Sequence, residues 1–188
     1  RDLRMSRGLG DVYKRQYKEY EVKAITTKCY ADEVAIPYVV IGLNGEIGEL
    51  CEKIEQETKE DLIVKELGDI FWYMAGIRVE LNLQIEDDWN WLLKPEYATN
   101  VLQLLSEAGK INEQVKKFLR DDWKTGEEIA FPEERRKVIE KAWKNIWLQL
   151  NTICDLMHIS IEEVARINNE KLASRKERNV IHGSGDER

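Results

Sequence analysis

The chain has 188 residues and a formal net charge of -7, and this length suffices for one domain or two small ones with an apolar core. The negative charge argues against a nucleic-acid partner held by a broad basic surface, whereas a local lysine or a metal ion still allows a small phosphorylated ligand. The three cysteines form no CxxC pair, which predicts reduced thiols and a cytoplasmic location. No stretch approaches the ~20 apolar residues of a membrane span, and we expect no membrane partner.

Apolar residues recur at intervals of three and four along the chain, which predicts an all-α fold. The stripe formed by Leu67, Phe71, Met74 and Ile77 is one example. Residues 1–16 show no such period and resemble an artefactual leader found in translations of environmental sequence assemblies, so we exclude them from the fold and expect disorder. Three helices are expected first, over about 17–29, 38–57 and 60–82, with a break over 31–37 and a connector over 87–95.

The second half repeats this plan weakly. Residues 106–110 correspond to residues 45–49, and residues 142–145 correspond to residues 66–69. A polar loop over 121–132 lengthens the linker between these two segments and precedes a helix that starts near Pro132 or Glu133. We therefore predict two related helical repeats, residues 17–96 and residues 97–188, packed as a bundle around a pseudo-twofold axis.

Two acidic pairs lie on neighbouring predicted helices of the first repeat, Glu46 with Glu49 and Glu66 with Asp69. A spacing of three places both members of a pair on one helix face, so two packed helices direct four carboxylates to one point. Four converging carboxylates require a cation, and oxygen ligands favour Mg²⁺, with Mn²⁺ as a possible substitute. A single acidic pair is common on solvated helices, and the combination of two ordered pairs carries the prediction.

Glycines accompany both acidic pairs. Gly48 and Gly68 stand inside predicted helices, where each costs ~1 kcal/mol relative to alanine. We expect a neighbouring backbone or a ligand to approach closely at both positions.

The second repeat has lost this acidic set. Its corresponding residues are Glu107, Lys110, Ala142 and Asn145, so three of the four acids are replaced and a lysine stands in one ligand position. We therefore predict that the first repeat binds metal and the second does not.

The ordered ExxE and ExxD segments, residues 42–53 and 65–73, resemble those of the all-α nucleoside triphosphate pyrophosphohydrolases of the MazG and dimeric dUTPase superfamily. Residues 165–188 are also similar to the last helix and glycine-containing tail of MazG-like members, many of them from phages. The resemblance covers most of residues 17–188 as two fused copies, the second one degenerate. It implies an intramolecular pseudo-dimer, with further homo-oligomerisation possible.

The resemblance implies Mg²⁺-dependent cleavage of a nucleoside triphosphate to the monophosphate and pyrophosphate, by attack of water at the α-phosphorus. It assigns Glu46, Glu49, Glu66 and Asp69 as metal ligands. From the chemistry of the site, Glu46 or Glu49 is the expected acceptor of the proton from water.

Substrate contacts are expected from both halves. Lys53 shares a stripe with Glu46 and Glu49 and is a candidate phosphate contact, although pairing with Glu49 explains it equally well. Tyr73 stands one turn after Asp69 and could line the nucleotide pocket or belong to the core. Asn168 and Lys171 match a family Asn-x-x-Lys pair implicated in nucleotide binding, so the last helix would complete the site of the first repeat.

A non-catalytic helical module that binds a partner or regulates one is the alternative function. It predicts no Mg²⁺ binding at the four acids and no release of pyrophosphate. The loss of acids from the second repeat alone favours an enzyme with one working half, because a scaffold gives no reason to retain the other four.

Overall fold

The computed structural model describes residues 15–85, 101–124 and 130–180. Within these ranges the regular secondary structure is entirely helical, which confirms the all-α prediction. The elements are a helix over residues 15–25, η1 (Asp32–Val34), α2 (Ala35–Glu55), α3 (Glu60–Glu80), α4 (Val101–Lys117), η3 (Phe118–Asp122), α5 (Glu133–Leu156) and α6 (Ile161–Glu177).

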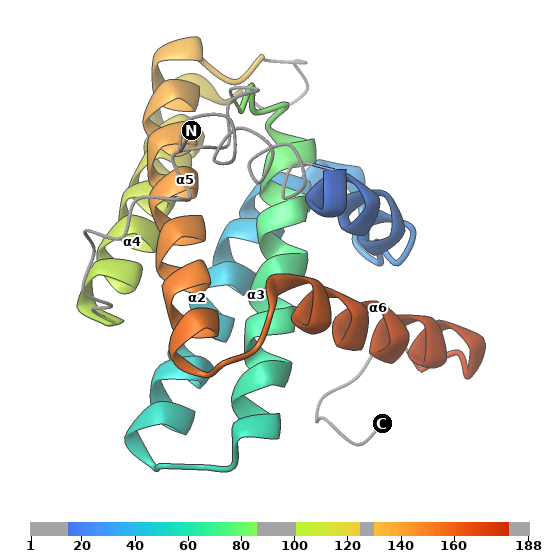
Figure 1. Cartoon of the computed structure of the whole chain (residues 1–188). Coiled ribbons are helices and arrows are strands. Elements are labelled where there is room, and N and C mark those ends of the chain that lie inside the picture. Colours follow the sequence, from blue (N-terminus) through green and yellow to red (C-terminus); the bar gives the residue numbers. More distant parts are fainter. Residues whose placement is uncertain (1–14, 86–100, 125–129, 181–188) are drawn as a thin grey trace, which may run out of the picture.

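Two helical hairpins form the bundle (Figure 1). Helices α2 and α3 pack against each other as one hairpin, α4 and α5 form the second, and α2 also contacts α4. The indole N–H of Trp143 on α5 donates to the carbonyl of Met74 on α3 at 2.9 Å, which joins the hairpins through their shared core. The largest side chains enclosed there include Trp143, Trp147, Phe71 and Leu43.

The helix over residues 15–25 and helix α6 lie beside the bundle on the α3 side (Figure 1). The Tyr17 ring packs edge-on against Trp143 and Trp147, with centroids 5.5 and 5.1 Å apart. The Trp72 indole of α3 donates to the carbonyl of Ala24 at 3.1 Å and to the hydroxyl of Thr27 at 2.9 Å. These contacts make residues 15 and 16 the start of a packed helix, while residues 1–14 of the predicted leader lie outside the described ranges.

Helix α2 begins earlier than predicted. It starts at Ala35 and contains Pro37 in its first turn, where a missing N–H costs nothing because the first four N–H groups of a helix have no partner within it. The first helix ends earlier than predicted, at residue 25, where the Thr26 and Thr27 hydroxyls donate to carbonyls three residues back at 2.7 and 2.6 Å. Such side-chain bonds compete with continued helix.

Helices α2, α3, α5 and α6 end in the same way. After each, a single residue has positive φ: Glu57, Asn82, His158 and Asn179. The N–H of the next residue then bonds a carbonyl of the last helical turn, as in the 2.9 Å contact from Val180 to Arg175, which caps otherwise unpaired carbonyls. Helix α6 starts with a capping serine, because the Ser160 hydroxyl accepts from the Glu163 N–H at 3.1 Å.

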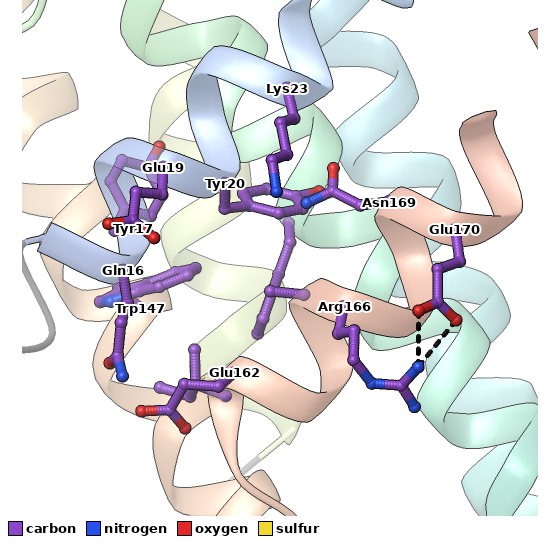
Figure 2. Close-up of a pocket in the computed structure, with 13 residues that line it drawn as sticks. Gln16, Tyr17, Glu19, Tyr20, Lys23, Trp147, Glu162, Arg166, Asn169 and Glu170 are labelled. Carbon is purple, nitrogen blue, oxygen red and sulfur yellow. Dashed lines mark hydrogen bonds and ion pairs between the residues drawn. The ribbon is translucent and has the colours of Figure 1, made fainter.

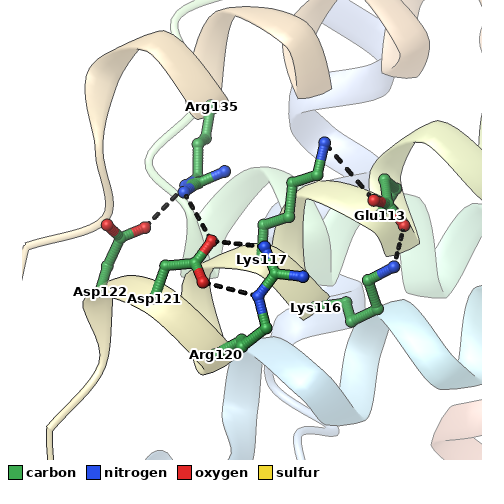
Figure 3. Close-up of polar contacts among 7 residues, drawn as sticks. All are labelled: Glu113, Lys116, Lys117, Arg120, Asp121, Asp122 and Arg135. Atoms are coloured by element: carbon green, nitrogen blue, oxygen red, sulfur yellow. Dashed lines mark hydrogen bonds and ion pairs between the residues drawn. The ribbon is translucent and has the colours of Figure 1, made fainter.

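Ion pairs join the turn η3, which follows α4, to the first turn of α5 (Figure 3). Arg135 of α5 contacts Asp122 of η3 at 2.7 Å and Asp121 at 3.7 Å. The last two residues of the π-helical turn η3, Asp121 and Asp122, fall in the predicted loop over 121–132, and residues 125–129 of that loop are outside the described ranges. Helix α5 begins at Glu133 after Pro132, as predicted. The predicted connector over 87–95 and tail over 181–188 also lie outside those ranges.

One stretch contradicts the expectation about membrane spans when length and composition alone are considered. Residues Asp32–Glu55 are long and apolar enough to cross a membrane. Six side chains of α2 are buried in the bundle, Val39, Leu43, Ile47 and Leu50 among them. Inside the protein, 33% of the apolar window of this stretch is buried, and a helix that packs one face on the core of a bundle can meet the same length and composition criteria as a span.

Candidate metal centre

Three of the four predicted acids gather between α2 and α3. Glu46 of α2 meets Glu66 and Asp69 of α3, and one carboxylate oxygen from each lies within 4.8 Å of the other two. Glu66 is only 2% exposed. Hard oxygen donors at this separation fit a small divalent cation such as Mg²⁺ or Mn²⁺ better than a soft metal.

Glu49 lies outside this group. It occupies the next turn of α2 and is exposed, although its charge still contributes to raising the pKa of Glu46. Its assignment as a metal ligand remains a prediction. Residues three apart differ in direction by about 60° around a helix, and on α2 the Glu46 side chain contributes an oxygen to the group while the exposed Glu49 does not.

The charged form of the Glu46 carboxylate is disfavoured by its surroundings. Burial raises its pKa to about 8, and the carboxylates of Asp69, Glu49 and Glu66 add to the effect, while Lys171 opposes it. A carboxylate that disfavours its own charge at neutral pH gains most from a bound cation. The raised pKa of Glu46, which arises partly from Asp69 and Glu66 themselves, agrees with a cation at the position that the three acids share.

The metal-free protein should therefore lose stability as pH rises from about 5 to about 8. Because the folded protein binds the Glu46 proton more tightly than the unfolded chain does, the free energy of unfolding falls across this window. In Glu46→Gln, the fall in melting temperature between pH 5 and pH 8 should be several °C smaller than in the wild type. Thermal unfolding in the presence of a chelator measures the difference. Glu52→Gln, an exposed change on α2, should keep the wild-type slope, and an unchanged slope in Glu46→Gln would contradict this account.

Helix α6 brings a lysine and an amide to the same acids. The Lys171 ammonium lies 2.6 Å from both carboxylate oxygens of Asp69, and the Asn168 amide donates to Asp69 Oδ1 at 3.0 Å. Asn168 is 1% exposed. The second half of the chain therefore contributes two predicted residues to the acidic group of the first half.

Gly68 explains how α6 approaches so closely. A Cβ atom at this position would lie 2.8 Å from the Asn168 Cβ and 2.9 Å from its Nδ2, so only glycine leaves room for the amide. The predicted close approach is confirmed for Gly68. At Gly48 an added Cβ would meet no atom of the described residues within 4 Å, so no neighbouring backbone approaches there, and the approach of a ligand stays a prediction.

An aromatic cleft of about 110 Å³ opens beside the acids. Tyr38, Trp72 and Tyr73 line it together with Glu46 and Asp69. The Tyr73 ring lies over Gly42, where an added Cβ would be 2.0 Å from the ring. The structure therefore places Tyr73 in this cleft, and the binding of a nucleotide there stays a prediction. Further lining residues are Thr27, Cys29, Leu172 and Arg175.

Lys53 is not brought to the acids. It stands in the last turn of α2, and neither an ion pair nor a side-chain hydrogen bond joins its ammonium to any of the four carboxylates. The alternative pairing with Glu49 is also absent. Its role as a phosphate contact stays a prediction.

The counterpart positions in the second hairpin form no comparable group among the described residues. Lys110 pairs with Glu107 at 2.7 Å, and Ala142 is buried in the core. This arrangement agrees with one acidic centre, while the duplication and its pseudo-twofold axis remain predictions.

Arg175 is the principal cleft residue that the sequence reasoning missed. It is 6% exposed and lines the same cleft as Glu46 and Asp69. Its spacing was the available signal, because it follows Lys171 by four positions and therefore shares its helix face. Tyr38 was missed because it marked the expected start of α2, where its facing direction was not predictable.

Comparisons with known proteins match the segment that carries the four acids. The MazG nucleotide pyrophosphohydrolase domain matches residues 38–88, which include all four acids. The Gene 37 protein of Mycobacterium phage L5 is 35% identical over 85 residues, a match that spans 45% of this chain and 70% of the phage protein. No solved structure matches the chain. The chain therefore belongs to the MazG nucleotide pyrophosphohydrolase family.

Proposed function

We propose that this protein is a Mg²⁺-dependent hydrolase that cleaves a (deoxy)nucleoside triphosphate at the α-phosphorus to the monophosphate and pyrophosphate. The family match indicates nucleoside triphosphate pyrophosphohydrolase activity in general. The observation that carries the finer proposal is the convergence of Glu46, Glu66 and Asp69 beside cations from α6. Anionic and cationic groups side by side fit a metal-bound triphosphate better than they fit either a bare metal or a bare anion.

Glu46, Glu66 and Asp69 would hold the cation, with Glu49 as the fourth predicted ligand. When bound, a divalent cation neutralises triphosphate charge and makes water more acidic. The residues of the chain do the remaining work. Glu46 or Glu49 would accept the proton of the attacking water, because a carboxylate within hydrogen-bond reach of that water can act as a general base.

The triphosphate would be held from α6. Lys171 and the buried Arg175 lie on one face of that helix, at the edge of the aromatic cleft. A lysine supplies a point charge to a phosphate, while an arginine binds two of its oxygens. The rings of Tyr38 and Tyr73 provide an apolar wall for the nucleoside end.

Lys171→Met should raise the KM for the nucleotide at least about tenfold, because a hydrogen bond to a charged group is worth roughly 1.5–3 kcal/mol. Direct Mn²⁺ affinity should stay level or increase, since the ammonium no longer competes for Asp69. Steady-state kinetics and metal titration measure the two effects. Lys176→Met on the exposed face of the same helix should change neither, and equal behaviour of both variants would remove Lys171 from the site.

The function is tested by incubating the protein with Mg²⁺ and each of the common dNTPs and NTPs, and by quantifying pyrophosphate and orthophosphate separately. Pyrophosphate with an equimolar amount of monophosphate is the expected product pair. Orthophosphate alone would exclude cleavage at the α position. No product from any nucleotide, with no metal bound, would instead support the non-catalytic helical module.

Further parts of the proposal concern the state of the protein. We propose a cytoplasmic protein that acts on small nucleotides without a nucleic-acid or membrane partner. The two hairpins would form an intramolecular pseudo-dimer in which α6 takes the place of a helix from a partner subunit. Size-exclusion chromatography with light scattering would show whether this unit associates further.

A further inference from the structure

A hydrogen-bonded chain runs from the first described helix to the metal centre. The Tyr20 hydroxyl donates to Asn168 Oδ1 at 2.8 Å, and Asn168 Nδ2 donates to Asp69 Oδ1 at 3.0 Å. Tyr20 is 3% exposed and Asn168 is 1% exposed. Figure 2 shows Tyr20 facing α6 from the neighbouring helix.

The order of donors along this chain fixes which end of the amide meets the acid. An asparagine amide has one accepting oxygen and one donating NH₂ group. Both Asp69 carboxylate oxygens accept from the Lys171 ammonium, and Oδ1 also accepts from the NH₂ end of Asn168. The Tyr20 hydroxyl supports this orientation by donating to the amide oxygen at the opposite end at 2.8 Å, a shorter contact than its alternative acceptor, the Gly68 carbonyl at 3.5 Å.

The Tyr20 hydroxyl keeps its donor role over the whole working range of pH. Burial, and the nearby charge of Asp69, hold its pKa well above the usual value. Without this donor, the amide oxygen would be buried and unpaired, and rotation of the amide would set that oxygen against the Asp69 carboxylate. Both outcomes are unfavourable.

We propose that Tyr20 is a positioning residue for the metal centre, acting through Asn168 on the carboxylate of Asp69. This inference rests on the proposed metal site and goes beyond the proposed reaction. Outer partners that orient a ligand typically change metal affinity 10–100-fold when they are removed. Tyr20 lies one residue further out, so the lower end of that range applies.

Tyr17 provides a matched control. It is a buried tyrosine one turn earlier in the same helix, also 3% exposed, and it packs on Trp143 and Trp147. Removal of its hydroxyl perturbs the same helix without touching the chain to Asp69.

The experiment measures Mn²⁺ dissociation constants by electron paramagnetic resonance, together with thermal unfolding, on the full chain. Tyr20→Phe should weaken Mn²⁺ binding about tenfold, whereas Tyr17→Phe should bind Mn²⁺ as the wild type does even where its melting temperature falls. In a double-mutant cycle, Tyr20→Phe should have no further effect on affinity once Asn168→Ala is present, since the effect passes through that amide.

The outcomes separate this inference from the proposed function. If the wild type binds Mn²⁺ and Tyr20→Phe binds it with the same affinity, the positioning role is overturned and the proposed metal site stands. Additive effects of Tyr20→Phe and Asn168→Ala would overturn it as well. Absence of Mn²⁺ binding in the wild type would overturn the metal site, and the positioning role with it.

Discussion

Glu66→Gln is expected to abolish pyrophosphate release, with at least a ~100-fold loss of kcat/KM. The side chain is 2% exposed and belongs to the three-acid group between α2 and α3. Glutamine keeps its size and shape, so the fold should persist while one anionic ligand is lost. Pyrophosphate assays at saturating Mg²⁺, with circular dichroism as the check on folding, measure the effect.

Glu107→Gln is the matched control for this substitution. Glu107 is the predicted counterpart of Glu46 in the second half, pairs with Lys110 and does not belong to the three-acid group, so Glu107→Gln makes the same chemical change outside that group. It should retain most of the wild-type activity. Similar losses in the two variants would contradict a single working centre. Glu49→Gln tests the role of the exposed fourth acid. Activity should fall if Glu49 is a metal ligand or the base, and it should be unchanged if Glu49 is neither.

Gly68→Ala is expected to dismantle the contact between α6 and the acids. The added methyl would meet the Asn168 side chain at 2.8 Å, and overpacking of this kind costs about 1–3 kcal/mol. The gain in helix propensity of ~1 kcal/mol offsets only part of this cost. Denaturant unfolding should show a net loss of stability, and Mn²⁺ affinity and activity should fall together because Asn168 and Lys171 move away from Asp69.

Gly109→Ala separates propensity from packing. Gly109 is an exposed position of α4 where an added Cβ meets nothing within 4 Å. The same chemical change should therefore stabilise the protein by about 0.5–1 kcal/mol and leave activity unchanged. If Gly68→Ala were equally stabilising and fully active, the packing of α6 at this position would not matter for the site.

Most of the fold prediction rested on the spacing of apolar residues along the sequence. The apolar spacing on α2 and α3 requires a helical hairpin, and the short segment between Glu55 and Glu60 leaves no other arrangement for two amphipathic helices. Helix ends were predicted less well. Pro37 reads as a boundary in the sequence but lies inside the first turn of α2, because local signals do not show which N–H groups are already unpaired.

The candidate site divides in the same way. Spacing placed Glu46, Glu66 and Asp69 on facing surfaces, and the structure brings these three together. Spacing could not distinguish Glu49, because interhelical rotation decides which of two residues on a face reaches the groove. The same limitation explains why Lys53, which shares the stripe, does not reach the acids.

The amino-acid sequence by itself determined an all-helical chain and two ordered acidic pairs in its first half, because these follow from residue type and spacing. Tertiary structure decided that α6 covers α3 over Gly68, that Arg175 reaches the cleft and that Tyr20 meets Asn168. Contacts between residues more than a hundred positions apart depend on how helices cross and how closely their backbones approach, and no local pattern records either quantity.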